Sequence, residues 1–173
     1  FGKALREAHA WGLIDKLPRV AAIQASGANP FFQSFTGGFK EQKKVTAETV
    51  ATAIRIGDPV NHARATETIT HTRGVVEEVT DDELMHAKSL IDQSGVGCEP
   101  ASACTLAGLR KLVQKGIVSP SERAVCILTG HVLKDPDVLT SDKYGKGNRA
   151  RIYTIDATSE EVAKRLGELS KLG

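Results

Sequence analysis

Thr129, Gly130 and His131 directly follow an apolar run at residues 124–128. A buried strand that ends in a hydroxyl and a glycine can hold a ligand, because open α/β sheets bind ligands beyond the carboxyl ends of their strands. The Thr129 hydroxyl can donate or accept a hydrogen bond, and Gly130 lets a flat molecule approach the backbone. On these residues alone, an ordinary strand-to-loop turn is the more common explanation.

Two further stretches carry groups that could contact a ligand. Glu99 stands at the start of an expected helix, where the helix dipole favours a carboxylate, and the small residues 101–103 would admit something planar. Residues 55–59 form a helix break that contains Ile56, Gly57 and Asp58. On these residues alone, capping and tight helix–sheet packing are the more common explanation of the first stretch, and generic turn chemistry explains the second equally well.

Composition limits the classes of protein to which the chain can belong. Its 173 residues are 40% hydrophobic and 25% charged, with a net charge of +2, which is typical of one globular domain. This charge gives no basis for nucleic-acid or membrane binding, and no apolar stretch is long enough to span a bilayer. The odd cysteine count (Cys98, Cys104 and Cys126) argues against a disulfide framework, and the scattered histidines argue against a metal site. We therefore expect a cytoplasmic protein.

Strands and helices should alternate along the chain. Short apolar runs bounded by Gly, Pro or polar residues predict strands, and the 3.6-residue spacing of apolar side chains predicts helices. A capping box of Thr80 and Glu83 marks one helix start, Pro30 fits the first turn of another, and Ser159 is the expected cap of the last. The expected strands are 20–25, 75–79, 124–130 and 151–157, and the expected helices are 1–15, 29–35, 47–55, 60–72, 81–95, 99–116 and 159–171.

This alternation predicts an α/β fold of three layers, a mainly parallel sheet with helices on both faces. The opening residues from Phe1 already read as the interior of a helix, with no N-cap ahead of them. We therefore expect that sequence is missing upstream of Phe1 and that residues 1–173 are a piece of a longer protein.

Three stretches in order resemble the threonine synthase family. They are ATAIRIGDPVN, GCEPASACTLAGLRKL and AVCILTGHVLKDP, and the opening FGKALREAHAWGLIDKLPRVAAIQASGANP agrees with them. That family uses pyridoxal 5'-phosphate and has the tryptophan-synthase-β-like fold, known as fold type II. The resemblance covers residues 1–140 and implies that the chain is part of the large, cofactor-binding domain.

The resemblance implies roles for several residues. Thr129 would hydrogen-bond the pyridine nitrogen of the cofactor, beside Gly130. Ile56 and Gly57 would lie over one cofactor face, and Glu99 would lie near the ring edge. No catalytic residue is expected within the chain, because the Schiff-base lysine and the smaller domain would lie upstream; Lys134-Asp135 lacks the serine of that lysine's motif.

The implied reaction converts O-phospho-L-homoserine and water to L-threonine and phosphate. This segment alone would be inactive, its partner would be the N-terminal remainder of the enzyme, and a homodimer is possible. A serine or threonine dehydratase of the same fold, or a non-catalytic relative, remains open. The chain departs from the family pattern at Val132, where a glycine is usual, and at Asp58, where an asparagine is usual.

Overall fold

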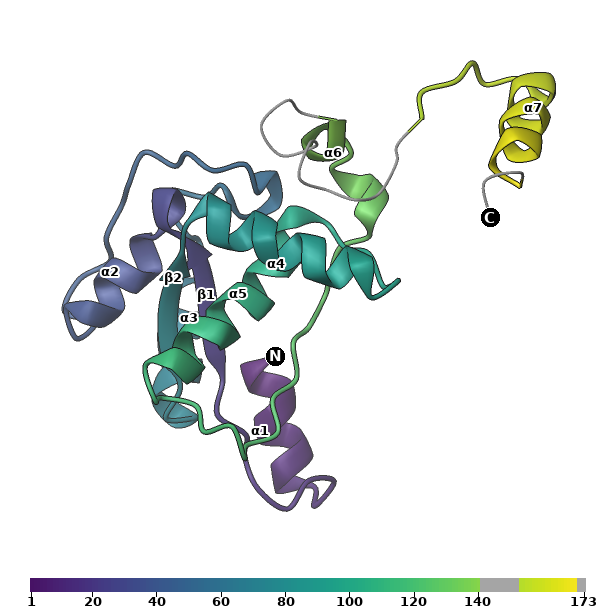
Figure 1. The fold of residues 1–173 in the computed structure, drawn as a ribbon. Coiled ribbons are helices and arrows are strands. Elements are labelled where there is room, and N and C mark those ends of the chain that lie inside the picture. The colour runs from purple at the N-terminus through teal and green to yellow at the C-terminus, as the bar shows by residue number, and fades with distance from the viewer. Residues whose placement is uncertain (141–152, 171–173) are drawn as a thin grey trace.

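Two parallel strands form the centre of the fold (Figure 1). The computed structural model describes residues 1–140 and 153–170. Strands β1 (Ala21–Ala25) and β2 (Val75–Val79) pair in register, with Ala22 opposite Val76. Parallel strands need a long crossover connection, which residues 26–74 supply. Both strands were predicted from their apolar runs, and both are confirmed.

Helices cover both faces of this sheet, as the alternation of elements predicts. Side chains alternate between the faces along each strand, so Ala22 and Val76 join one apolar cluster while Ile23 and Val79 join another. The first cluster includes residues of α2 (Pro30–Thr36) and α3 (His62–His71), and the second includes residues of α4 (Asp81–Gln93) and α5 (Pro100–Gln114). The three-layer α/β class is confirmed.

The remaining elements are short or peripheral. They are the helices α1 (Gly2–Ala10), α6 (Asp137–Thr140) and α7 (Ser159–Leu169) and the 3₁₀ turns η1 (Ser26–Ala28), η2 (Thr52–Ile54) and η3 (Val132–Lys134). Helix α1 ends earlier than predicted, because the chain turns at Gly12, whose φ of 72° favours glycine.

The apolar run 124–130 has no regular secondary structure and forms no strand pairing within the described residues, so the predicted strand is wrong there. Its side chains alternate as in a strand: Val125 and Ile127 are exposed, whereas Cys126 and Leu128 are half-buried. A strand requires a neighbour with which to exchange hydrogen bonds, and the apolar composition of this run does not supply one.

Residues 47–55 are also not the predicted helix. Asp81 at the start of α4 accepts hydrogen bonds from the Thr49 hydroxyl (2.5 Å) and from the Val50 backbone N–H (3.1 Å). These contacts hold the segment irregular, and only η2 is helical. Tertiary hydrogen bonds therefore override a weak local propensity.

The C-terminal predictions fare differently. Helix α7 is present, but its N-cap is Thr158 rather than Ser159, because the Thr158 hydroxyl accepts from the Glu161 backbone N–H at 3.3 Å. The strand predicted at 151–157 begins outside the described residues, and its described part, 153–157, is not a strand.

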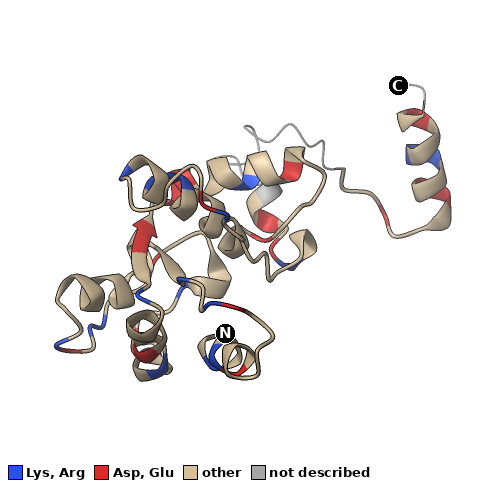
Figure 2. Cartoon of the chain, turned by 90° about the horizontal axis from the view of Figure 1, so that it is seen from below, with Lys and Arg blue, Asp and Glu red and all other residues tan. Residues whose placement is uncertain are grey.

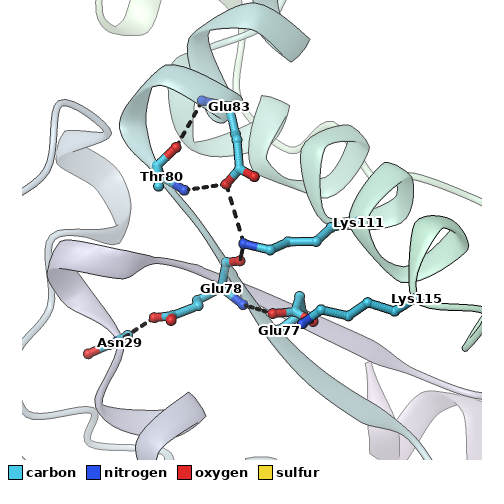
Figure 3. Close-up of polar contacts among 7 residues, drawn as sticks. All are labelled: Asn29, Glu77, Glu78, Thr80, Glu83, Lys111 and Lys115. Carbon is cyan, nitrogen blue, oxygen red and sulfur yellow. Dashed lines mark hydrogen bonds and ion pairs between the residues drawn. The ribbon is translucent and has the colours of Figure 1, made fainter.

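A polar network joins β2 to α4 and α5 (Figure 3). Adjacent glutamates of β2 point to opposite sides: Glu77 pairs with Lys115 at 2.5 Å, and Glu78 accepts from Asn29 at 2.6 Å. Lys115 is half exposed whereas the Glu77 side chain is 4% exposed, so this ion pair keeps a buried carboxylate compensated.

The predicted capping box of α4 is confirmed in the same network. The Thr80 hydroxyl accepts from the Glu83 N–H at 3.2 Å, and the Glu83 carboxylate accepts from the Thr80 N–H at 2.7 Å and lies 3.4 Å from the Lys111 ammonium (Figure 3). Burial raises the pKa of Glu83, but the Thr80 hydrogen bond and the Lys111 charge outweigh it and hold the pKa below its usual value.

The replacement Glu83→Gln should therefore reduce stability in a pH-dependent way. A depressed folded pKa means that the carboxylate contributes above its unfolded pKa, about 4.3, and that the contribution disappears as the pH falls through the lower folded value. Gln keeps the capping hydrogen bond, so only the charge is removed. We expect the free energy of unfolding to fall by about 0.5 kcal/mol at pH 7, a small effect because the Glu83 side chain is partly exposed. Urea unfolding of the wild-type protein and the variant at pH 7 and in acid measures this loss. A stability difference between the two proteins that does not shrink in acid would contradict this account.

Gly108 allows α5 to approach the sheet closely. A Cβ there would lie 2.4 Å from Cδ1 of Ile23 on β1. We expect Gly108→Ala to destabilise the protein by about 1–3 kcal/mol through overpacking, despite the better helix propensity of alanine. Gly167→Ala in α7, where nothing lies within 4 Å, is the matched control and should be neutral or slightly stabilising. Equal unfolding midpoints for the two variants would refute this role of Gly108.

Charged residues of both signs are interspersed over the described part of the chain (Figure 2). Among the described residues, no helix is both long and apolar enough to cross a membrane.

Candidate cofactor site

Glu99 and Gly130 meet at the N-terminus of α5. The Glu99 N–H donates to the Gly130 carbonyl at 3.0 Å, and the Gly130 N–H donates to the Ser102 hydroxyl at 2.9 Å. Gly130 is buried against the Glu99 side chain, so that a Cβ would lie 2.0 Å from its carboxylate. Two of the three stretches singled out in the sequence, those around Glu99 and around Gly130, therefore form one cluster, although they are about 30 residues apart.

Thr129 directly precedes Gly130 of this cluster and is exposed. The preceding residue, Leu128, packs on the buried residues Ile91, Cys98 and Ala103, whereas Thr129 is exposed. An anchored backbone with an exposed hydroxyl can offer a hydrogen bond to a ligand without leaving a buried group unsatisfied.

The turn after Gly130 neutralises the buried carboxylate. The Lys134 ammonium lies 3.3 Å from Glu99 Oε2, and the Glu99 side chain is only 4% exposed. The turn itself is capped by His131, which accepts from the Leu133 N–H. Val132, the departure from the family glycine, lies near Gly97, where even an added Cβ would be no closer than 3.5 Å to it, so this turn accommodates the valine.

Ile56 and Gly57 lie on a different segment from this cluster. Gly57 pairs with Val45, whose N–H donates to its carbonyl at 3.0 Å, and Ile56 is 50% exposed. A link to the cluster runs through η2, where the Thr52 hydroxyl donates to Asp135 at 2.8 Å. The structure therefore brings Glu99 next to Gly130 and its neighbour Thr129. A contact of residues 56 and 57 with a ligand stays a prediction.

The Asp58 carboxylate pairs with a neighbouring lysine and accepts a hydrogen bond from a neighbouring glutamine. The Lys44 ammonium lies 2.7 Å from its carboxylate, and Gln42 donates to it at 2.8 Å. The Lys44 hydrogen bond lowers the pKa of Asp58. The negative charge that Asp58 brings, where the family usually has asparagine, is thus neutralised by Lys44.

Cys98 and Cys104 are packing residues rather than nucleophiles. Cys98 and Cys104 are buried, and burial, followed by neighbouring thiols, raises the pKa of Cys104 to about 12. Burial also raises the pKa of Cys98. A thiol that stays protonated is a poor nucleophile and a poor metal ligand.

Sequence reasoning missed Lys88, which the structure places next to the cluster. Its side chain is 1% exposed, and its ammonium reaches the Cys98 carbonyl at 2.6 Å and Asp92 at 2.9 Å. Helical spacing gives a signal, because Lys88 lies four residues after Leu84 and three before Ile91 on the buried side of α4.

Comparison with known proteins defines the class. A family model described as "Pyridoxal-phosphate dependent enzyme" matches residues 1–130, and the chain belongs to this family. The solved structure of a threonine deaminase from T.th. has the same kind of fold, with a TM-score of 0.50 and 18% identity over 69% of this chain and 41% of that chain.

The similar curated proteins are threonine synthases. That of Methanocaldococcus jannaschii is 46% identical over 78% of this chain and 34% of its own length. That of Methanosarcina acetivorans is 45% identical over 79% of this chain and 34% of its own length. The chain spans about a third of the length of these relatives.

Proposed function

We propose that this chain is the C-terminal part of the cofactor-binding domain of a threonine synthase. The complete protein would convert O-phospho-L-homoserine and water to L-threonine and phosphate. The similarity to two threonine synthases, at 45% and 46% identity over more than three quarters of the chain, carries this proposal.

The residues present fit the ring end of pyridoxal phosphate. Thr129 would offer a neutral hydroxyl to the pyridine nitrogen of the cofactor, which would leave that nitrogen largely unprotonated. Gly130 allows the Glu99 side chain to pack directly beside it, since a Cβ there would lie 2.0 Å from the Glu99 carboxylate. When bound, the cofactor supplies an electron sink for the reacting carbon. This segment would hold and orient the ring, with Glu99 near its edge and with Ile56 and Gly57 over one face.

The rest of the site would come from the N-terminal remainder of the same enzyme. We propose that it contributes the lysine that binds the cofactor covalently and the pocket for the cofactor phosphate, and that residues 1–173 alone are inactive. A cytoplasmic location and a homodimer accompany this proposal.

Product analysis of the complete protein, loaded with pyridoxal phosphate, tests the function. With O-phospho-L-homoserine we expect equal amounts of L-threonine and phosphate, quantified by chromatography and by a phosphate assay. A second candidate, a threonine deaminase-like activity, is favoured by the structural neighbour. Formation of 2-oxobutyrate from L-threonine, without threonine formation, would favour this alternative. Neither product would indicate a non-catalytic relative.

A further inference from the structure

Lys88 is a buried cation that holds the backbone of the candidate site. Its ammonium lies 2.9 Å and 3.2 Å from the two Asp92 carboxylate oxygens, and it donates to the Cys98 carbonyl at 2.6 Å. Removing an ammonium from water is costly, and replacing a buried ion pair by neutral groups often leaves stability unchanged. Stability alone is therefore a weak explanation for this charge.

The carbonyl that Lys88 binds is the last backbone group before Glu99. The Glu99 N–H in turn donates to the Gly130 carbonyl, and Gly130 directly follows Thr129. Two hydrogen bonds and two peptide links, 98–99 and 129–130, therefore connect the ammonium to the backbone of the residue proposed to face the pyridine nitrogen.

The surrounding apolar packing supports the same geometry. One buried cluster contains Ile91 of α4, Cys98 of the loop after α4, and Ala103 of α5. Leu128 packs against this cluster. The residue before Thr129 and the residue held by Lys88 thus share one packed unit, which transmits a displacement of either to the other.

We propose that Lys88 is a positioning residue for the cofactor site. Its ammonium fixes the Cys98 carbonyl and thereby sets the spacing between Glu99 and Thr129. Lys88 itself touches neither cofactor nor substrate. The identity of the ligand, pyridoxal phosphate, rests on the proposed function.

The test uses two charge-neutralising double variants of the complete protein. Lys88→Met/Asp92→Asn removes the hydrogen bond to Cys98 without leaving a lone buried charge. Lys115→Met/Glu77→Gln is the matched control, because it neutralises an ion pair between α5 and β2 that makes no contact with the site cluster among the described residues. Lys88→Gln/Asp92→Asn, which keeps a polar group at residue 88 that is one atom shorter than lysine and leaves no lone charge, is the milder variant should the first fail to fold.

We expect the Lys88 variants to weaken binding of pyridoxal phosphate, measured by absorbance titration, and to lower kcat by up to a hundredfold, because small misplacements of reacting groups carry such effects. KM should change less than kcat. The control should keep wild-type affinity and kcat. Wild-type affinity in the Lys88 variants, or an equal loss in both pairs, would overturn the proposal.

Hydrogen exchange separates this inference from the proposed function. The Glu99 and Gly130 amides should exchange faster in the Lys88 variants than in the control, with or without cofactor. If the wild-type protein binds no pyridoxal phosphate, the proposed function fails, and the exchange rates alone decide: unchanged rates overturn the positioning role, and faster rates support it.

Discussion

Replacing Thr129 by Val in the complete protein should slow turnover about a hundredfold and weaken binding of pyridoxal phosphate. Loss of the hydroxyl leaves the pyridine nitrogen without its proposed partner, and a tilted ring misplaces the reacting carbon. The free energy of unfolding should change by no more than about 0.5 kcal/mol, because the Thr129 side chain is exposed. Steady-state kinetics, cofactor titration and urea unfolding measure these three quantities.

Two control variants sharpen this prediction. Thr129→Ser keeps a hydroxyl and should retain most of the activity. Thr70→Val makes the same replacement at an exposed position on α3 and should leave activity unchanged. Full activity in Thr129→Val would refute the role of this hydroxyl.

Replacing Gly130 by Ala should damage both the fold and the site. The new Cβ would lie 2.0 Å from the Glu99 carboxylate, which is buried and paired with Lys134, so the carboxylate has to move. We expect a loss of about 1–3 kcal/mol in the free energy of unfolding, as for overpacked cores. Cofactor affinity should fall as well, because Glu99 and the backbone next to Thr129 shift together.

Gly95→Ala provides a comparison for the Gly130 variant. Gly95 has open space around its Cβ position but a φ of 82°, so alanine there brings backbone strain without a side-chain clash. We expect that variant to lose stability while keeping cofactor affinity. Wild-type affinity in Gly130→Ala would contradict the close approach of Glu99 to the cofactor.

Local signals in the sequence account for much of the fold. The capping box of Thr80 and Glu83 and the proline at the start of α2 are local features, and both mark helices correctly. Short apolar runs predict strands β1 and β2. Their apolar side chains contact the helices on both faces of the sheet. Such features depend on neighbours within a few residues, which a sequence displays directly.

The errors occur where distant residues decide the conformation. Residues 47–55 resemble a helix, but Asp81 binds Thr49 and Val50 and holds them irregular. Residues 124–130 have the composition of a strand, but pairing depends on a neighbouring strand that composition does not specify.

The candidate site was predicted only in part for the same reason. Thr129, Gly130 and Glu99 could be singled out as residue types, and the family resemblance gives them roles. The hydrogen bond between Glu99 and Gly130, and the contact of Lys88 with the Cys98 carbonyl, arise from packing of α4, α5 and the 124–130 segment.

A crystal structure of the complete protein with pyridoxal phosphate tests the central claim most directly. The predicted result is a pyridine nitrogen within about 2.7–3.2 Å of the Thr129 hydroxyl oxygen, with Glu99 near the ring edge. A cofactor bound with its nitrogen against a different side chain, or at a place remote from Thr129, would contradict the account.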